Sequence, residues 1–132
     1  MLTKLSTASR YGLRALKYLA QNPGPRSVAE ISQAEKISKT YLEKIFNRLQ
    51  KGGVITASRG AQGGYILNKK PARISLLEVF NILENQTSSQ CHLSNGGSCT
   101  CGLAGCTVGA LENQLENLLL TAIKKITLRD LL

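Results

Sequence analysis

The chain of 132 residues lacks most of the features that membrane, secreted and catalytic proteins require. No apolar run approaches the roughly 20 residues that cross a bilayer, and the N-terminus lacks the pattern of a signal peptide. The sequence has one histidine, no phosphate-binding P-loop and no set of residues that resembles a catalytic triad. We therefore expect a cytoplasmic protein that has no membrane contact and is not an enzyme.

Acidic residues are also scarce, with eight Asp and Glu against 17 Lys and Arg. The imbalance lies in residues 1–73, where 14 basic residues face three acidic ones, a net charge of +11; residues 74–132 have three against five, a net charge of −2. A basic half joined to a near-neutral half is typical of a polyanion-binding module attached to a part that assembles or senses. A solubilising surface would have the same composition, so charge alone does not decide between them.

Three short helices are predicted in the basic half. Apolar residues at helical spacing predict the first over residues 7–22, which the sequence Asn-Pro-Gly-Pro then stops. Ser27 and Glu30 have the spacing of a capping box and predict a second helix. Ser38 is placed to cap a third helix, which ends at residues 52–53, a pair of glycines.

Two β-prone runs follow, at residues 54–58 and 65–67, and the glycine-rich residues between them predict a hairpin. Helix, helix-turn-helix and hairpin in this order are typical of a winged helix-turn-helix, in which the third helix enters the major groove of DNA. The predicted fold class is therefore mainly α, with three helices and a β-hairpin wing forming a DNA-binding domain over residues 1–73.

The remaining residues divide into three predicted parts. Ser75 and Glu78 again have capping-box spacing and start a connecting helix within residues 74–90. Residues 91–106 lose all periodicity, and we interpret them as a cysteine-rich sensor loop. Residues 107–132 contain a long amphipathic helix with no obvious partner in so small a chain, which favours a dimerisation helix because helix-turn-helix proteins commonly pair to match two half-sites. Thr127 is placed to cap a last short turn.

The loop contains all four cysteines, Cys91, Cys99, Cys101 and Cys106. In a cytosolic protein such a cluster is more often metal-binding or redox-active than a set of structural disulfides. The spacing matches neither zinc ribbons nor ferredoxins, although thiolates suit both iron-sulfur centres and zinc. Free thiols that form a reversible disulfide without any metal are the alternative.

Several motifs together resemble the Rrf-type regulators. They are Arg10-Tyr11-Gly12-Leu13-Arg14-Ala15, Ile37-Ser38-x-x-Tyr41-Leu42-Glu43-x-Ile45-Phe46-x-Arg48-Leu49, Arg59-Gly60-x-x-Gly63-Gly64-Tyr65, and the cysteine loop before the long helix. The resemblance implies a homodimeric transcription factor whose third helix enters the major groove and whose wing lies toward the minor groove. It also implies that many relatives hold an iron-sulfur cluster on three loop cysteines and a fourth ligand, while others respond to a protein partner.

The candidate DNA contacts lie in the third helix and the wing. They are Ser38, Lys39, Thr40, Tyr41, Glu43, Lys44, Asn47 and Arg48 in the helix, and Arg59, Gly60, Gln62, Gly63 and Gly64 in the wing. A carboxylate facing the groove accepts a hydrogen bond from the cytosine amino group, and the resemblance gives Glu43 this base-reading role. The alternative is a surface ion pair with Lys39 or Lys44.

In the wing, Arg59 is placed to enter a narrow minor groove, and the glycines permit a close approach to DNA. A simple hairpin turn with an incidental arginine is the alternative. Tyr11 and Tyr65 stand in apolar patterns and are expected in the core or at an interface.

The family pattern assigns Cys91, Cys99 and Cys106 as three cluster ligands. The fourth ligand is open, because Gly109 stands where cluster regulators have a histidine. Arg10 and Arg14 occupy the helix-one positions where other relatives have acidic or histidine ligands. Cys101 is the best candidate, with His92, water or no ligand as alternatives, and the cofactor would be a 2Fe-2S or 4Fe-4S cluster.

We therefore predict a homodimeric regulator that binds a double-stranded DNA operator and is gated by an iron-sulfur cluster or by the redox state of the loop. The alternative is a repressor without cofactor, controlled by a protein partner or by thiol oxidation.

Overall fold

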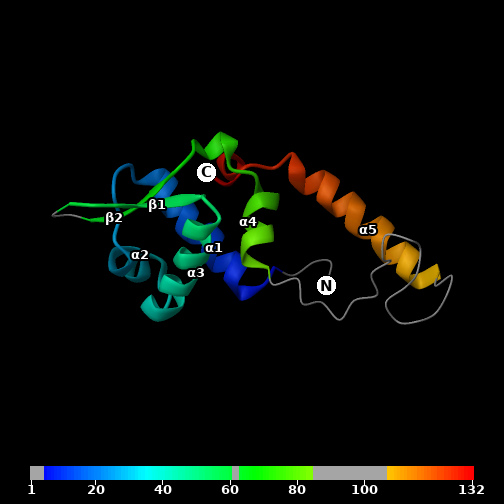
Figure 1. Cartoon of the computed structure of the whole chain (residues 1–132), viewed down its shortest axis with the longest axis horizontal. Coiled ribbons are helices and arrows are strands. Elements are labelled where there is room, and N and C mark those ends of the chain that lie inside the picture. Colours follow the sequence, from blue (N-terminus) through cyan, green and yellow to red (C-terminus); the bar gives the residue numbers. More distant parts are fainter. Residues whose placement is uncertain (1–4, 61–62, 85–106) are drawn as a thin grey trace.

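The computed structural model describes residues 5–60, 63–84 and 107–132 (Figure 1). Its helices are α1 (Thr7–Gln21), α2 (Val28–Glu35), α3 (Lys39–Lys51), α4 (Leu76–Leu83) and α5 (Thr107–Lys124), with 3-10 turns η1 (Pro71–Arg73) and η2 (Leu128–Leu131). Strands β1 (Ile55–Ser58) and β2 (Gly64–Leu67) pair in antiparallel fashion. The predicted winged helix-turn-helix, mainly α with a β-hairpin wing, is confirmed.

The start of α2 differs from the predicted capping box in one respect. The hydroxyl of Ser27 accepts a hydrogen bond from the Glu30 backbone N–H at 3.1 Å, so the cap is present. The Glu30 carboxylate does not return to Ser27 but accepts bonds from Tyr18 Oη and Arg26 Nη1, both at 3.0 Å. That hydrogen bond to Glu30 raises the pKa of Tyr18. Glu30 therefore links α1 to the turn before α2 instead of completing a box.

The start of α3 corrects a second capping prediction. Ser38 is the N-cap residue of α3, but its side chain makes no capping hydrogen bond. Its hydroxyl stays on the exposed surface, whereas Ser6, Ser27 and Ser75 each accept the backbone N–H three residues ahead. The Ser38 hydroxyl is therefore not committed to its own helix.

The core lies where α1, α2 and α3 meet. The inner stripe of α3, made of Leu42, Ile45, Phe46 and Leu49, is buried against Leu16 and its neighbours. The Phe46 ring also packs edge-on against Tyr65 of β2, with ring centroids 4.9 Å apart, which confirms the predicted core position of that tyrosine. This packing fixes the direction in which the opposite face of α3 points.

A third backbone segment supports the wing. Arg26 and Tyr65 form an antiparallel bridge, with the Tyr65 N–H donating to the Arg26 carbonyl at 2.8 Å and the Arg26 N–H to the Tyr65 carbonyl at 3.1 Å. A Cβ atom at Gly64 would lie 2.5 Å from the Arg26 carbonyl carbon. Gly64 is therefore needed for packing within the chain, a reason that the sequence reading did not supply.

The last residues of the chain return to this body. Residues 75 and 127 form a bridge, and the Leu128 N–H donates to the Ile74 carbonyl at 2.8 Å. The Leu128 side chain is fully buried. Thr127 and Asp130 form a complete capping box, which confirms the predicted cap of the last turn.

Helix α5 contrasts with this docked end. It extends away from the body (Figure 1) and leaves large apolar side chains exposed, among them Val108 at 63%, Leu111 at 55% and Leu118 at 68%. The amphipathic pattern read from the sequence is thus real, and the described part of the chain leaves much of its apolar row uncovered.

Candidate nucleic-acid interface

The outer face of α3 is the main candidate surface. Because the inner stripe is buried, the residues between its members point outward and are exposed. This exposed set contains Ser38, Lys39, Thr40, Glu43, Lys44, Asn47 and Arg48, all predicted as DNA contacts. The hydroxyl, amide and ammonium groups of this row can donate hydrogen bonds to phosphates and to base edges. The carboxylate can accept hydrogen bonds from base edges.

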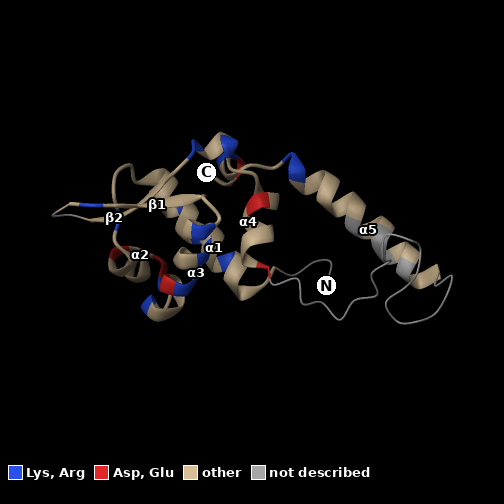
Figure 2. Ribbon diagram, viewed as in Figure 1, with Lys and Arg blue, Asp and Glu red and all other residues tan. Residues whose placement is uncertain are grey.

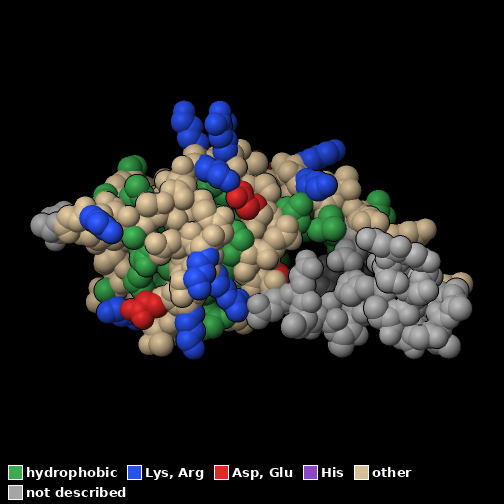
Figure 3. Space-filling model, viewed as in Figure 1, with side chains coloured by type: hydrophobic (Ala, Val, Ile, Leu, Met, Phe, Trp, Pro, Cys, Tyr) green, Lys and Arg blue, Asp and Glu red, His purple; other side chains and the backbone are tan. Residues whose placement is uncertain are grey.

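This face is basic. Helix α3 carries Lys39, Lys44, Arg48 and Lys51 against a single acid, Glu43. The ion pairs found among the described residues join Arg14 to Glu35, Arg26 to Glu30 and Lys69 to Glu78, so they leave the cations of α3 unneutralised. Basic residues mark α3 in Figure 2, and Figure 3 shows basic side chains gathered over it.

Glu43 is exposed on this face. The alternative reading, an ion pair with Lys39 or Lys44, is not formed in the structure, because no ion pair among residues 5–60, 63–84 and 107–132 includes Glu43. Its carboxylate is therefore open to a partner outside the described chain.

Tyr41 stands at the border of the face and is partly buried. Its ring packs edge-on against Tyr11 of α1, with centroids 5.8 Å apart, and Tyr11 also packs against the core, as predicted. The Arg14 guanidinium lies 5.8 Å from the centre of the Tyr11 ring. Tyr41 is thus held by α1 at one end of the exposed row.

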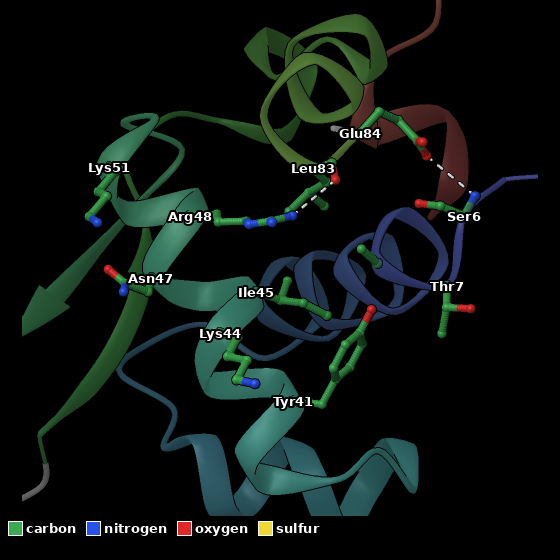
Figure 4. Close-up of a pocket in the computed structure, with 11 residues that line it drawn as sticks. Ser6, Thr7, Tyr41, Lys44, Ile45, Asn47, Arg48, Lys51, Leu83 and Glu84 are labelled. Carbon is green, nitrogen blue, oxygen red and sulfur yellow. Dashed lines mark hydrogen bonds between the residues drawn. The ribbon is translucent and has the colours of Figure 1, made fainter. Parts of the chain in front are cut away.

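Arg48 lies differently from its neighbours. It points toward α4, and its Nη1 donates to the carbonyl of Leu83 at 3.2 Å (Figure 4). Lys44 and Asn47 point away from that contact in the same view. Arg48 is exposed overall, but one of its donors is already engaged inside the chain.

In the wing, Arg59 follows β1 directly and is exposed. Gly60 has φ of +148°, a conformation that side chains rarely adopt, and its carbonyl accepts the Gly63 N–H at 3.0 Å. Gly60 and Gly63 therefore shape the tip, whereas Gln62 lies outside the described residues. The geometry places Arg59 at the end of a hairpin that projects from the body (Figure 1).

The predicted cluster ligands Cys91, Cys99, Cys101 and Cys106 and the alternative His92 lie outside the described residues. Among the residues that the structure does describe, no group of three or more His, Cys, Asp and Glu is arranged to hold a metal ion. On α1, Arg10 is exposed and Arg14 Nε pairs with Glu35 at 3.0 Å. A guanidinium is not a usual metal ligand, so these two side chains offer no ligand group on α1.

The sequence reading missed a cavity of about 650 Å³ between α1, α3 and the end of α4 (Figure 4). Lys51 lines it, seven residues after Lys44 and on the same side of α3; this spacing was the signal that the reading did not use. Glu84 lines it too and accepts hydrogen bonds from Ser9 Oγ at 2.5 Å and the Ser6 N–H at 3.3 Å. Burial raises the pKa of Glu84, but these bonds outweigh burial and the net pKa is lowered. No local sequence pattern could predict this contact, because Glu84 and Ser9 are 75 positions apart in the sequence.

In the described part of the chain, no helix has the length and apolar character needed to cross a membrane.

Comparison with known proteins gives consistent results. The family model Rrf2, described as an iron-dependent transcriptional regulator, matches residues 5–132. The HTH-type transcriptional regulator IscR of Escherichia coli O1:K1 / APEC is 34% identical over 130 residues, which cover 97% of this chain and 79% of that protein. The structure of T. potens IscR has a TM-score of 0.78 at 28% identity, covering 97% of this chain and 85% of its own. CymR, the global cysteine regulator of B. subtilis, has a TM-score of 0.76 at 29% identity, covering 97% and 95%.

Proposed function

The chain belongs to the Rrf2 family of transcriptional regulators and is not an enzyme; from this premise we propose that it is a cytoplasmic homodimer that binds a specific double-stranded DNA operator. The observation that carries the proposal is the outer face of α3, where exposed cations surround an exposed Glu43 and none of these groups forms an ion pair with the described residues. A surface of this kind attracts the phosphate backbone and presents one carboxylate to the bases.

The two kinds of contact have different roles. Ser38, Thr40 and Lys44 donate to phosphates and hold α3 in register on the duplex. Glu43 accepts from a cytosine amino group and discriminates between bases, while Arg59 reaches the minor groove, where the negative potential is greatest. The free hydroxyl of Ser38 supports this division, because no capping bond competes for it.

The experiment starts from an operator selected from random duplex DNA, with binding measured by fluorescence anisotropy. We expect Glu43→Ala to lose about 1 to 3 kcal/mol of discrimination at one base position. The matched control, Lys44→Ala, is expected to weaken operator and random DNA alike and to reduce the salt slope by about 0.9. Equal losses on both DNAs for Glu43→Ala would contradict base reading, and failure to select any duplex would contradict sequence-specific binding.

The dimer is supported by α5. Its exposed apolar row lies on an arm that extends from the body, and burying such a row against a second copy is favourable at about 25 cal/mol per Å². Two copies would present two α3 helices to half-sites about 34 to 36 Å apart.

We further propose that the four cysteines sense a signal through an iron-sulfur cluster, of the 2Fe-2S or 4Fe-4S type, or through their own redox state. Four thiolates suit such a cluster chemically, and the arginines of α1 leave Cys101 as the best fourth ligand. When bound, the cluster would supply a redox-sensitive centre whose ligation is coupled to local folding. The residues that would hold it are Cys91, Cys99, Cys106 and Cys101.

The second candidate is a regulator without cofactor, which responds to thiol oxidation or to a protein partner. Gly109 and the two α1 arginines favour it, because they remove the non-cysteine ligands of relatives. Protein purified without oxygen separates the candidates by its iron and sulfide content and its visible spectrum. Bound iron and sulfide are expected for a cluster, whereas free thiols that form a disulfide on oxidation support the second candidate. Unchanged regulation after replacement of all four cysteines by serine would point to the protein partner.

A further inference from the structure

The end of α4 packs closely against α3 and α1. A Cβ atom on Gly52, at the end of α3, would lie 2.3 Å from Ile82 Cδ1. A Cβ atom on Gly12 of α1 would lie 2.3 Å from Leu83 Cδ1. Both glycines leave room for the ends of α4 side chains, so α3 and α1 each pack closely against the last turn of α4.

A polar contact joins α3 to the same turn. Arg48 Nη1 donates to the carbonyl of Leu83, the last residue of α4, at 3.2 Å. The final carbonyls of a helix have no partner within it, and a cation beside them is favoured by the helix dipole. The Arg48 guanidinium therefore satisfies a carbonyl at the C-terminal end of α4 (Figure 4).

The next residue holds this turn from the other side. The Glu84 carboxylate accepts from Ser9 Oγ and the Ser6 N–H at the start of α1. Ser9 is fully buried and Glu84 is partly buried, so the contact lies at the edge of the packed interior. The end of α4 is thus fixed between α1 and α3 by three hydrogen bonds, one from Arg48 and two to Glu84.

We propose that Arg48 is a positioning residue, which sets the position of α3 relative to α4 through the Leu83 carbonyl and does not neutralise an operator phosphate. This inference rests on the proposed DNA-binding function. It separates Arg48 from Lys44, which belongs to the same exposed row but points away from α4 and makes no ion pair within the described residues.

Salt dependence distinguishes the two roles. Each phosphate neutralised by a cation contributes about 0.9 to the slope of log affinity against log salt. A residue that only positions α3 contributes nothing to that slope, and its loss mainly misaligns the base contacts, which need a more exact geometry than the phosphate contacts. We therefore expect Arg48→Ala to weaken operator binding about tenfold, to leave the slope unchanged and to leave random-DNA binding nearly unchanged. Lys44→Ala is the matched control, with a slope lower by about 0.9 and similar losses on both DNAs.

One further variant keeps the test independent of folding. Arg48→Lys retains a donor for the Leu83 carbonyl and should restore most of the operator affinity. Circular dichroism melting of each variant identifies any that fails to fold.

The outcomes are distinct. A slope that falls with Arg48→Ala as it does with Lys44→Ala would make Arg48 a phosphate contact and overturn the inference, while the proposed function stands. A folded Arg48→Lys that binds the operator as weakly as Arg48→Ala would also overturn it, because restoring a donor to the Leu83 carbonyl would then not restore the binding geometry. If the wild-type chain itself selects no operator, the proposed function fails first.

Discussion

Helices α3 and α5 are both amphipathic, yet the molecule treats their apolar faces in opposite ways. In α3 the apolar stripe is buried, and Phe46 has no exposed surface at all. In α5 the corresponding row is open, with Leu118 68% exposed. Periodicity alone therefore identifies a helix with an apolar face, but what covers that face depends on elements that lie far away in the sequence.

The difference teaches what each helix needs in order to be stable. Helix α3 is covered by its own chain, which leaves its polar face free to be shaped for recognition. Most helical stability comes from packing of an apolar face, and α5 lacks much of that packing in the described chain. We infer that α5 gains its stability from association.

The largest effect is expected inside the body. Phe46→Ala removes a fully buried ring from the α3 stripe and should lower the free energy of unfolding by about 3 to 5 kcal/mol. Urea denaturation measures this fall in the free energy of unfolding. If residues 1–73 fold within one chain, the fall should not depend on protein concentration. A loss below about 1 kcal/mol would mean that α3 is not anchored as the structure shows.

The α5 counterpart should behave differently. Leu118→Glu places a charge in the exposed row and is expected to dissociate the dimer, raising the dissociation constant at least about 100-fold because an unpaired charge would be buried between the copies. Sedimentation velocity measures the mass. Asn117→Glu adds the same charge at an exposed polar position away from that row and should leave the mass unchanged. A monomeric wild type would remove the proposed role of α5.

A smaller contrast separates two of the N-cap serines, Ser27 and Ser38. Ser27→Ala removes a capping bond and should destabilise the fold by about 1 kcal/mol. Ser38→Ala removes none and should change stability by less than about 0.5 kcal/mol, while weakening DNA binding. Thermal melts and anisotropy titrations of the pair check both expectations. A destabilised Ser38→Ala would show that its hydroxyl serves the helix after all.

The smallest effect is a pH dependence at Glu84. Its pKa is lowered from the ordinary value of 4.5, so the folded state favours the charged carboxylate. Such a group contributes stability above its unfolded pKa, and that contribution is lost as the pH falls through the folded value. The melting temperature of the wild type should therefore fall more steeply than that of Glu84→Gln from about pH 5 to about pH 3. Parallel curves would contradict the contact with Ser6 and Ser9.

Local patterns predicted the elements because each pattern has a local cause. The spacing of Leu42, Ile45, Phe46 and Leu49 indicated the buried face of α3, and β-prone runs around a glycine-rich turn indicated the wing. The capping predictions were only partly correct, since a motif does not show whether a carboxylate such as Glu30 finds a better partner. The family resemblance, confirmed by the comparisons, supplied the role of the fold.

The contacts that join distant segments were not predictable in this way. The sequence grouped Arg48 with its exposed neighbours, because helical spacing cannot show that the end of α4 lies beside it. Gly64 was predicted to permit a close approach to DNA, whereas its close contact with the Arg26 backbone already requires a glycine there. The packing of Leu128 against the body was likewise invisible, because one leucine in a short turn carries no sign of its partner.

That docked end also has a geometric consequence for the proposed dimer. The carbonyl of Ile126 accepts the Leu76 N–H at 3.0 Å, only two residues after α5 ends at Lys124. The direction of α5 relative to the body is thus fixed by this two-residue connection. One residue inserted there would turn α5 by about 100° about its axis. In the proposed dimer, the number of residues between the end of α5 and the Ile126 contact would therefore set the distance between the two α3 helices.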